Sequence, residues 1–273
     1  MSAPVDYEVE YNNRARVPEN PELIAGWARD AAAYRARQAP RLVRYGAGAR
    51  NVIDYFPGSH DGPIVVFIHG GYWQALDNSF FSHLAGGLNA HGIGVAIPSY
   101  DLCPDVSLDR IIVEMREACR ELARLGHPLV VSGHSAGGHL AAMMMCAQWP
   151  LFDRRLPKDL WKGALTISGV YDLRPLLEVD FLQVDLRLDE SAATRLSPAL
   201  MMPATRCPVM SCVGGDESSE FHRQNAMIGE RWRAAFAGDI PMPGRNHFSV
   251  VDGLAEQDSP LFAGARRLMK LDR

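Results

Sequence analysis

Residues 131–139 read VSGHSAGGH, and the centre of this run, Gly133-His134-Ser135-Ala136-Gly137, has the spacing Gly-x-Ser-x-Gly. A serine in this spacing can attack an acyl group when it stands on a tight turn between a strand and a helix. The flanks predict both elements, because 128–131 is a short apolar run and 138–147 is rich in Ala, Met and Leu. We therefore predict Ser135 as a nucleophile. A Gly-rich helix start with a capping serine is the alternative.

A serine hydroxyl needs a base to accept its proton. Two histidines follow Ser135 beyond its own helix, His222 and His247. His247 lies in the turn-forming stretch PMPGRNHFS (241–249) after a probable strand, and a loop suits a catalytic base. His222 falls in the first turn of a predicted polar helix, where a solvated face is expected. We predict His247 as the base.

A carboxylate must orient that base, and the run 208–213 is a buried-strand pattern that ends in Gly-Gly-Asp216-Glu217. A carboxylate at the carboxyl end of a strand points into the loops where such sites assemble. We predict Asp216 as the orienting acid. Glu217 is the rival, and it is expected to cap the following helix instead.

Donors for an oxyanion are suggested by IVVFIHGGYW (64–73), a strand that runs into His-Gly-Gly. Glycines allow main-chain N–H groups to approach a tetrahedral intermediate, so Gly70 or Gly71 would act with the N–H of Ala136. His69 is expected to brace this loop rather than act as a base. A plain Gly-Gly turn is the alternative.

Three aromatic residues lie beside these groups: Tyr72, Trp73 and Phe248. They are predicted to wall an aromatic pocket, although packing in the core is an equal alternative for Trp73 and Phe248. The chemistry outlined so far requires neither a metal nor an organic cofactor.

Strand and helix patterns alternate along the chain, which predicts a mainly parallel sheet covered by helices on both faces. Two regions fit that core poorly, 1–46 and 171–205, and we predict them as cap elements over Ser135 within a single domain, 1–273. The predicted strands are 51–56, 63–69, 94–99, 128–131, 163–168 and 208–213, and the predicted helices are 21–37, 78–91, 108–126, 138–147, 219–236 and 261–271.

Composition and charge limit the classes of partner that this protein is expected to bind. The chain has 273 residues, 47% of them hydrophobic, which is enough for one large core. A net charge of −4 and a pI near 6.1 argue against nucleic acid or an anionic membrane as partners. The five cysteines show no metal-ligand spacing and are expected as free thiols. The acidic N-terminus without an apolar core segment favours the cytoplasm, and a homo-oligomer is possible.

The whole chain resembles the α/β-hydrolase superfamily. Three pieces are similar to its kynurenine formamidase (arylformamidase) branch: HGGYW (69–73), GHSAGGHL (133–140) and DESSEFHRQ (216–224). Esterases of the hormone-sensitive-lipase type are similar at YDLCP (100–104) but typically carry a third glycine where this chain has Tyr72, which favours the formamidase branch.

The resemblance implies an α/β-hydrolase fold with small cap insertions and hydrolysis of an N-formyl aryl amine, an aromatic small-molecule substrate, by Ser135, His247 and Asp216. Activity on activated aryl esters is expected as well. Two other functions stay open: a general carboxylesterase for short-chain or aryl esters, and a non-catalytic ligand-binding relative, which would be expected to carry a damaged triad.

Overall fold

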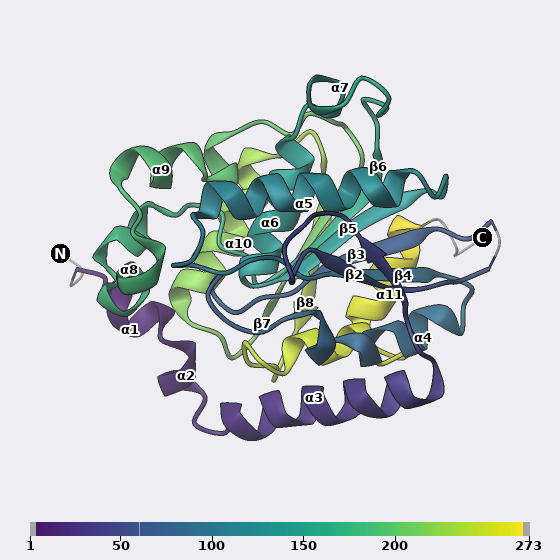
Figure 1. The fold of residues 1–273 in the computed structure, drawn as a ribbon. Coiled ribbons are helices and arrows are strands. Elements are labelled where there is room, and N and C mark those ends of the chain that lie inside the picture. The colour runs from purple at the N-terminus through teal and green to yellow at the C-terminus, as the bar shows by residue number, and fades with distance from the viewer. Residues whose placement is uncertain (1–3, 60, 270–273) are drawn as a thin grey trace.

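The computed structural model describes residues 4–59 and 61–269. Their strands form one eight-stranded sheet in the order β1-β2-β4-β3-β5-β6-β7-β8 (Figure 1). The pairs β1/β2 and β2/β4 are antiparallel and the other five neighbouring pairs are parallel, so the expected mainly parallel sheet is confirmed. The strands are β1 (Arg41–Arg44), β2 (Val52–Phe56), β3 (Ile64–Ile68), β4 (Gly94–Pro98), β5 (Leu129–His134), β6 (Trp161–Ile167), β7 (Val209–Gly214) and β8 (Phe236–Met242).

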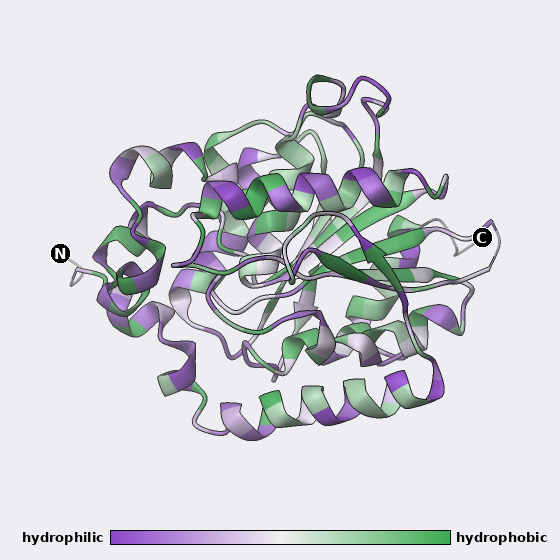
Figure 2. Ribbon diagram, in the orientation of Figure 1, coloured by the Kyte–Doolittle hydropathy of each residue, from purple (hydrophilic) through white to green (hydrophobic). Residues whose placement is uncertain are grey.

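The central strands are apolar on both faces, as β3 illustrates. Ile64, Val66 and Ile68 pack into one buried cluster, whereas Val65 and Phe67 pack into a second cluster on the opposite face. Successive side chains of a strand point to opposite faces, so a continuous apolar run requires a cover on each side. Figure 2 shows this as hydrophobic strands at the centre of the molecule, with hydrophilic residues along the outer helices.

Helices supply those covers (Figure 1). One side carries α5 (Leu108–Ala123), α6 (Ala136–Cys146) and α10 (Ser219–Arg231), and the other carries α3 (Asn20–Arg37), α4 (Ala85–Asn89) and α11 (Pro260–Leu268). The expected helical cover of both faces is confirmed. The shorter helices are α1 (Tyr7–Tyr11), α2 (Asn13–Arg16), α7 (Trp149–Phe152), α8 (Asp180–Leu186) and α9 (Glu190–Arg195).

Some element boundaries differ from those expected. The predicted helix 78–91 consists of two 3₁₀ turns, Asn78–Phe80 and Ser82–Leu84, followed by α4, whose adjacent glycines weaken helix formation. The predicted helix 219–236 ends at Arg231, because the chain from Phe236 onward pairs with β7 as β8. Of the predicted helix 261–271, residues 270 and 271 lie outside the described residues.

The first segment predicted as a cap also contains β1, which pairs with β2 at the edge of the sheet, so residues 41–44 are part of the core fold rather than a cap. Its α1 lies beside α8 of the second predicted cap segment in Figure 1. The main-chain N–H of Asp180, the first residue of α8, donates to Glu8 of α1 over 2.8 Å. Residues 1–3 of the first segment are outside the described residues. Within 4–59 and 61–269, no helix is both long enough and apolar enough to cross a bilayer.

Candidate active site

Ser135 stands on the turn between β5 and α6, with φ 57° and ψ −121°. A Cβ on Gly133 would lie 2.1 Å from the carbonyl oxygen of Gly137, and a Cβ on Gly137 would lie 1.9 Å from that of Ile68. No side chain fits at either position, so both must be glycine for steric reasons. The glycines allow the strand and helix to approach closely enough to hold Ser135 in this unfavourable conformation.

His247 lies in the loop after β8, and its Nε2 atom is 3.0 Å from the Oγ atom of Ser135. His247 is 5% exposed, and its ring packs against Phe221 with ring centroids 4.5 Å apart. This placement of His247 beside Ser135 is the one expected. His222 is exposed on α10, as expected for a solvated face.

The carboxylate beside His247 belongs to Glu217. Its Oε2 atom is 2.6 Å from Nδ1 of His247, and the side chain is buried. The prediction that Asp216 orients His247 is therefore wrong, since Asp216 is exposed to solvent. The expectation that Glu217 caps the next helix is wrong as well, because Ser218 is the N-cap of α10.

The turn after β7 explains why Glu217, rather than Asp216, contacts His247. The N–H of Asp216 donates to the carbonyl of Arg245 over 3.0 Å, and this bond ties the turn to the loop that carries His247. The buried Oε1 of Glu217 then accepts two hydrogen bonds, from the N–H of Gly214 at 2.7 Å and from the hydroxyl of Ser168 at 2.5 Å. With both oxygens satisfied, the carboxylate has a fixed orientation toward the imidazole.

The loop after β3 packs directly against the serine. A Cβ on Gly70 would lie 3.0 Å from the Cβ of Ser135, so the main chain of the two loops is in close contact. Gly71 has φ 105°, a conformation suited to glycine. His69 is buried and stacks on Tyr100 at 4.2 Å, and its Nδ1 atom is 2.8 Å from the carbonyl oxygen of Gly70. Burial lowers the pKa of His69 to about 4, so the neutral ring braces this loop as expected.

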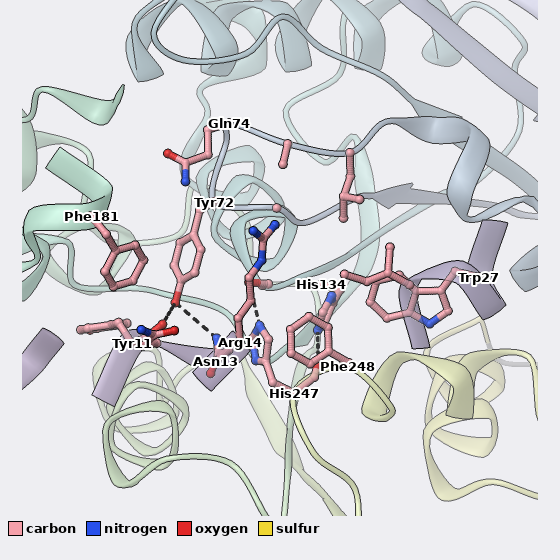
Figure 3. Close-up of a pocket in the computed structure, with 16 residues that line it drawn as sticks. Tyr11, Asn13, Arg14, Trp27, Tyr72, Gln74, His134, Phe181, His247 and Phe248 are labelled. Carbon is pink, nitrogen blue, oxygen red and sulfur yellow. Dashed lines mark hydrogen bonds between the residues drawn. The ribbon is translucent and has the colours of Figure 1, made fainter. Parts of the chain in front are cut away.

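A cavity of about 150 Å³ opens onto Ser135 and His247 (Figure 3). Tyr72 and Phe248 line it, as predicted. Trp73 does not: it is fully buried and packs edge-on against His139, so its prediction as a pocket residue is corrected to core packing. Tyr72 and Trp73 both have positive φ, 48° and 59°, so the main chain turns sharply between these consecutive aromatic residues.

The sequence patterns did not identify most of the other residues that line this cavity. They include Tyr11, Asn12, Asn13, Arg14, Ile24 and Trp27 from the N-terminal segment, with Phe181 from α8. The sequence predicts the two segments as caps because they do not fit the sheet pattern, but no local motif marks individual residues in them. Their arrival at the cavity depends on contacts over long stretches of sequence, such as the bond from the Tyr72 hydroxyl to the carbonyl of Tyr11 at 2.7 Å.

Comparisons with known proteins agree with this geometry. A model described as "Alpha/beta hydrolase family" matches residues 65–271. Kynurenine formamidase of Danio rerio is 31% identical over 232 residues, and that of Salmo salar 30% over 230; each alignment covers 79% of this chain and 77% of the relative.

Solved structures extend the likeness to nearly the whole chain. A putative thioesterase from Silicibacter sp. TM1040 has a TM-score of 0.85 at 34% identity and covers 95% of this chain and 98% of its own. Esterase B from Lactobacillus rhamnosis, at 20% identity and a TM-score of 0.65 over 93% of this chain and 96% of its own, shares the fold. This chain belongs to the alpha/beta hydrolase family, in its kynurenine formamidase-like branch.

Proposed function

We propose that this protein is a serine hydrolase of the arylformamidase type, which cleaves an N-formyl aryl amine to formate and the free amine. The observation that carries the proposal is the chain of hydrogen bonds from Ser135 to His247, at 3.0 Å, and from His247 to Glu217, at 2.6 Å. Ser135 and His247 both line a cavity with aromatic walls. The names of the curated relatives, kynurenine formamidases from three animals, support the formamide as the substrate.

In the proposed reaction His247 removes the proton of Ser135 while Oγ attacks the formyl carbon. The imidazolium that forms is stabilised by the Glu217 carboxylate, which also keeps the proton on Nδ1 and Nε2 free to accept. His247 then returns the proton to the leaving nitrogen, and water repeats the cycle on the formyl-serine. The amine leaves before deacylation, and formate leaves after it.

The negative charge of the tetrahedral intermediate would be held by main-chain N–H groups. Ala136 begins α6, so its N–H belongs to the helix terminus beside the nucleophile, where the helix dipole favours negative charge. Gly71 lines the cavity and Gly70 lies against Ser135, which supports this loop as the second donor.

The test is steady-state kinetics with N-formylkynurenine beside p-nitrophenyl acetate and p-nitrophenyl butyrate, with the Ser135→Ala protein as blank. A kcat/KM of about 10⁴ M⁻¹s⁻¹ or more for the formamide, roughly the lower limit for an evolved substrate, is expected. Turnover of the two esters without turnover of the formamide would reject the arylformamidase and favour a carboxylesterase.

A thioester substrate is the second candidate, because the solved relative at 34% identity is described as a putative thioesterase. A short-chain acyl thioester belongs in the same assay series. The same nucleophile, base and oxyanion donors would serve a formamide and a thioester, so the ratio of the two kcat/KM values decides between them. A kcat/KM for the thioester at least tenfold above that for N-formylkynurenine would favour this candidate.

A further inference from the structure

The first turn of α10 is held from outside by a residue of α1. The Oε2 atom of Glu10 accepts two hydrogen bonds there, from the main-chain N–H of Glu220 and from the hydroxyl of Ser219, each at 2.8 Å. The first N–H groups of a helix have no partner within the helix, so an external acceptor satisfies one of them. Ser218, the N-cap of α10, accepts from the N–H of Phe221 over 3.4 Å. Glu10 therefore makes the shorter of the two capping contacts.

Glu10 is suited to this position as an anion. Burial opposes its ionisation, but the bonds from Glu220 and Ser219 and the guanidinium of Arg16, 3.9 Å away, outweigh that effect and lower the pKa of Glu10. A carboxylate at the start of a helix also meets the positive end of the helix dipole. The side chain is therefore ionised at neutral pH and holds its two donors by charge-assisted hydrogen bonds.

The two residues that Glu10 holds stand between two that contact His247. Glu217 precedes them with one residue between, and its carboxylate lies 2.6 Å from the Nδ1 atom of His247. Phe221 follows them directly, and its ring packs on the imidazole with centroids 4.5 Å apart. A displacement of this turn would therefore move both the carboxylate and the ring that orient the base.

A second glutamate on the same helix provides a contrast. Glu8 accepts from the main-chain N–H of Asp180 at the start of α8, over 2.8 Å. This helix contributes Phe181 to the wall of the cavity. Two positions apart on α1, Glu8 is thus bonded to the cap helix α8, whereas Glu10 is bonded to the turn that follows Glu217.

We propose that Glu10 is a positioning residue for the reaction: from α1 it fixes the turn 217–221 and so keeps Glu217 and His247 in the geometry that activates Ser135. The N-terminal segment then has two roles, since it also lines the cavity. This inference rests on the proposed function, but only on its nucleophile, base and acid, so it holds for an ester as for a formamide.

The first experiment compares three variants with the parent protein in steady-state hydrolysis of p-nitrophenyl acetate. Glu10→Ala removes both bonds, and we expect kcat to fall about five- to twentyfold, because the loss lies in the orientation of acid and base. Glu10→Gln keeps an acceptor oxygen and should retain at least about a third of the parent kcat. Glu8→Ala releases α1 from α8 and should keep kcat within about twofold, whatever its effect on KM.

The rate at which a fluorophosphonate modifies Ser135 is measured on the same four proteins, because it reports the activation of the serine without turnover. It should fall together with kcat in Glu10→Ala. The proposal is overturned if Glu10→Ala keeps the parent kcat and labelling rate, or if Glu8→Ala loses as much as Glu10→Ala. A parent protein that is labelled but hydrolyses no formamide rejects the arylformamidase and leaves this comparison valid, whereas a parent that is neither labelled nor active overturns both proposals.

The second experiment tests whether Glu10 acts through α10. Ser219→Ala removes one of the two donors to Glu10 from an exposed position, and it should lower kcat about two- to threefold. In the double variant the two losses should not add, because both act through one contact, so its kcat should match that of Glu10→Ala. Circular dichroism checks the fold, and Ser219→Ala alone serves if Glu10→Ala does not fold. A full loss from each substitution in the double variant, or an unchanged kcat in Ser219→Ala, contradicts the assignment.

Discussion

The Nε2 atom of His134 lies 2.8 Å from the main-chain oxygen of His247. A carbonyl oxygen accepts, so Nε2 of His134 carries the proton and donates. Burial, together with the neighbouring His247, holds the pKa of His134 well below its usual value, and the ring is therefore neutral. His134, which directly precedes the nucleophile Ser135, thus holds the main chain of the base His247 in place.

His134→Phe keeps a ring at this position but removes the donor. We expect kcat to fall about tenfold with KM changed less than threefold, because the loop loses the bond that positions His247 while an aromatic ring is retained in the cavity lining. Steady-state kinetics check the split. Equal kcat values in the variant and the parent would leave the bond without a positioning role.

Ser135→Ala should lower hydrolysis of every substrate by at least about 10⁴-fold, since His247 and Glu217 have no other nucleophile to serve. Its circular dichroism spectrum and melting temperature should stay near those of the parent or rise, because alanine removes only the hydroxyl from a strained position. Substantial turnover in this variant contradicts the mechanism.

Glu217→Gln should cost roughly 10³- to 10⁴-fold in kcat, because an amide cannot stabilise the imidazolium and can favour the wrong tautomer of His247. The matched control is Asp216→Asn at the adjacent exposed position, which should change kcat less than threefold. Both rates come from one p-nitrophenyl acetate assay. The reverse order would restore Asp216 as the orienting acid.

Gly71→Ala should lower kcat by about a hundredfold, the usual loss when one oxyanion donor moves. Alanine tolerates φ 105° poorly, and its Cβ would lie 2.3 Å from the carbonyl oxygen of Ala75. Gly26→Ala on α3 is the control: its nearest contact is a flexible arginine side chain at 3.6 Å, so activity should be retained and stability should rise by about 0.5–1 kcal/mol. A fully active Gly71→Ala enzyme would exclude this loop as a donor.

Asp252→Asn should stabilise the protein at neutral pH but not in acid. Burial raises the pKa of Asp252 to about 6, while the Trp27 indole N–H donates to its carboxylate at 3.0 Å. The folded state therefore holds this proton more tightly than the unfolded state, and stability is lost as the pH rises from about 4 to 6. Thermal melts at pH 4 and pH 8 should show a gain of about 1–2 kcal/mol at pH 8 alone. An equal gain at both values would mean that ionisation is not the cause.

Local chemistry made part of the site readable from the chain. Gly133, Ser135 and Gly137 lie within five residues between a strand pattern and a helix pattern, so the turn and its steric demands are specified locally. His247 could be chosen because a loop position after a strand differs in pattern from a helix face. The six inner strands, β2 to β7, were also predictable, since an apolar run buried on both faces needs no distant partner to be recognised, whereas the edge strands β1 and β8 are not among the predicted ranges.

Tertiary structure decided the rest. Asp216 and Glu217 are adjacent carboxylates after the same strand, and only the contact of that turn with Arg245 determines which of them reaches His247. Trp73 and Tyr72 are adjacent aromatic residues, yet one is buried in the core and the other lines the cavity. Asn13 and Arg14 carry no motif. They reach the site because α1 and α2, more than a hundred residues before Ser135 in sequence, pack beside the cavity. Sequence alone determined the nucleophile because its geometry is local, whereas the choice of acid and of cavity wall depends on packing between distant segments, which no local pattern encodes.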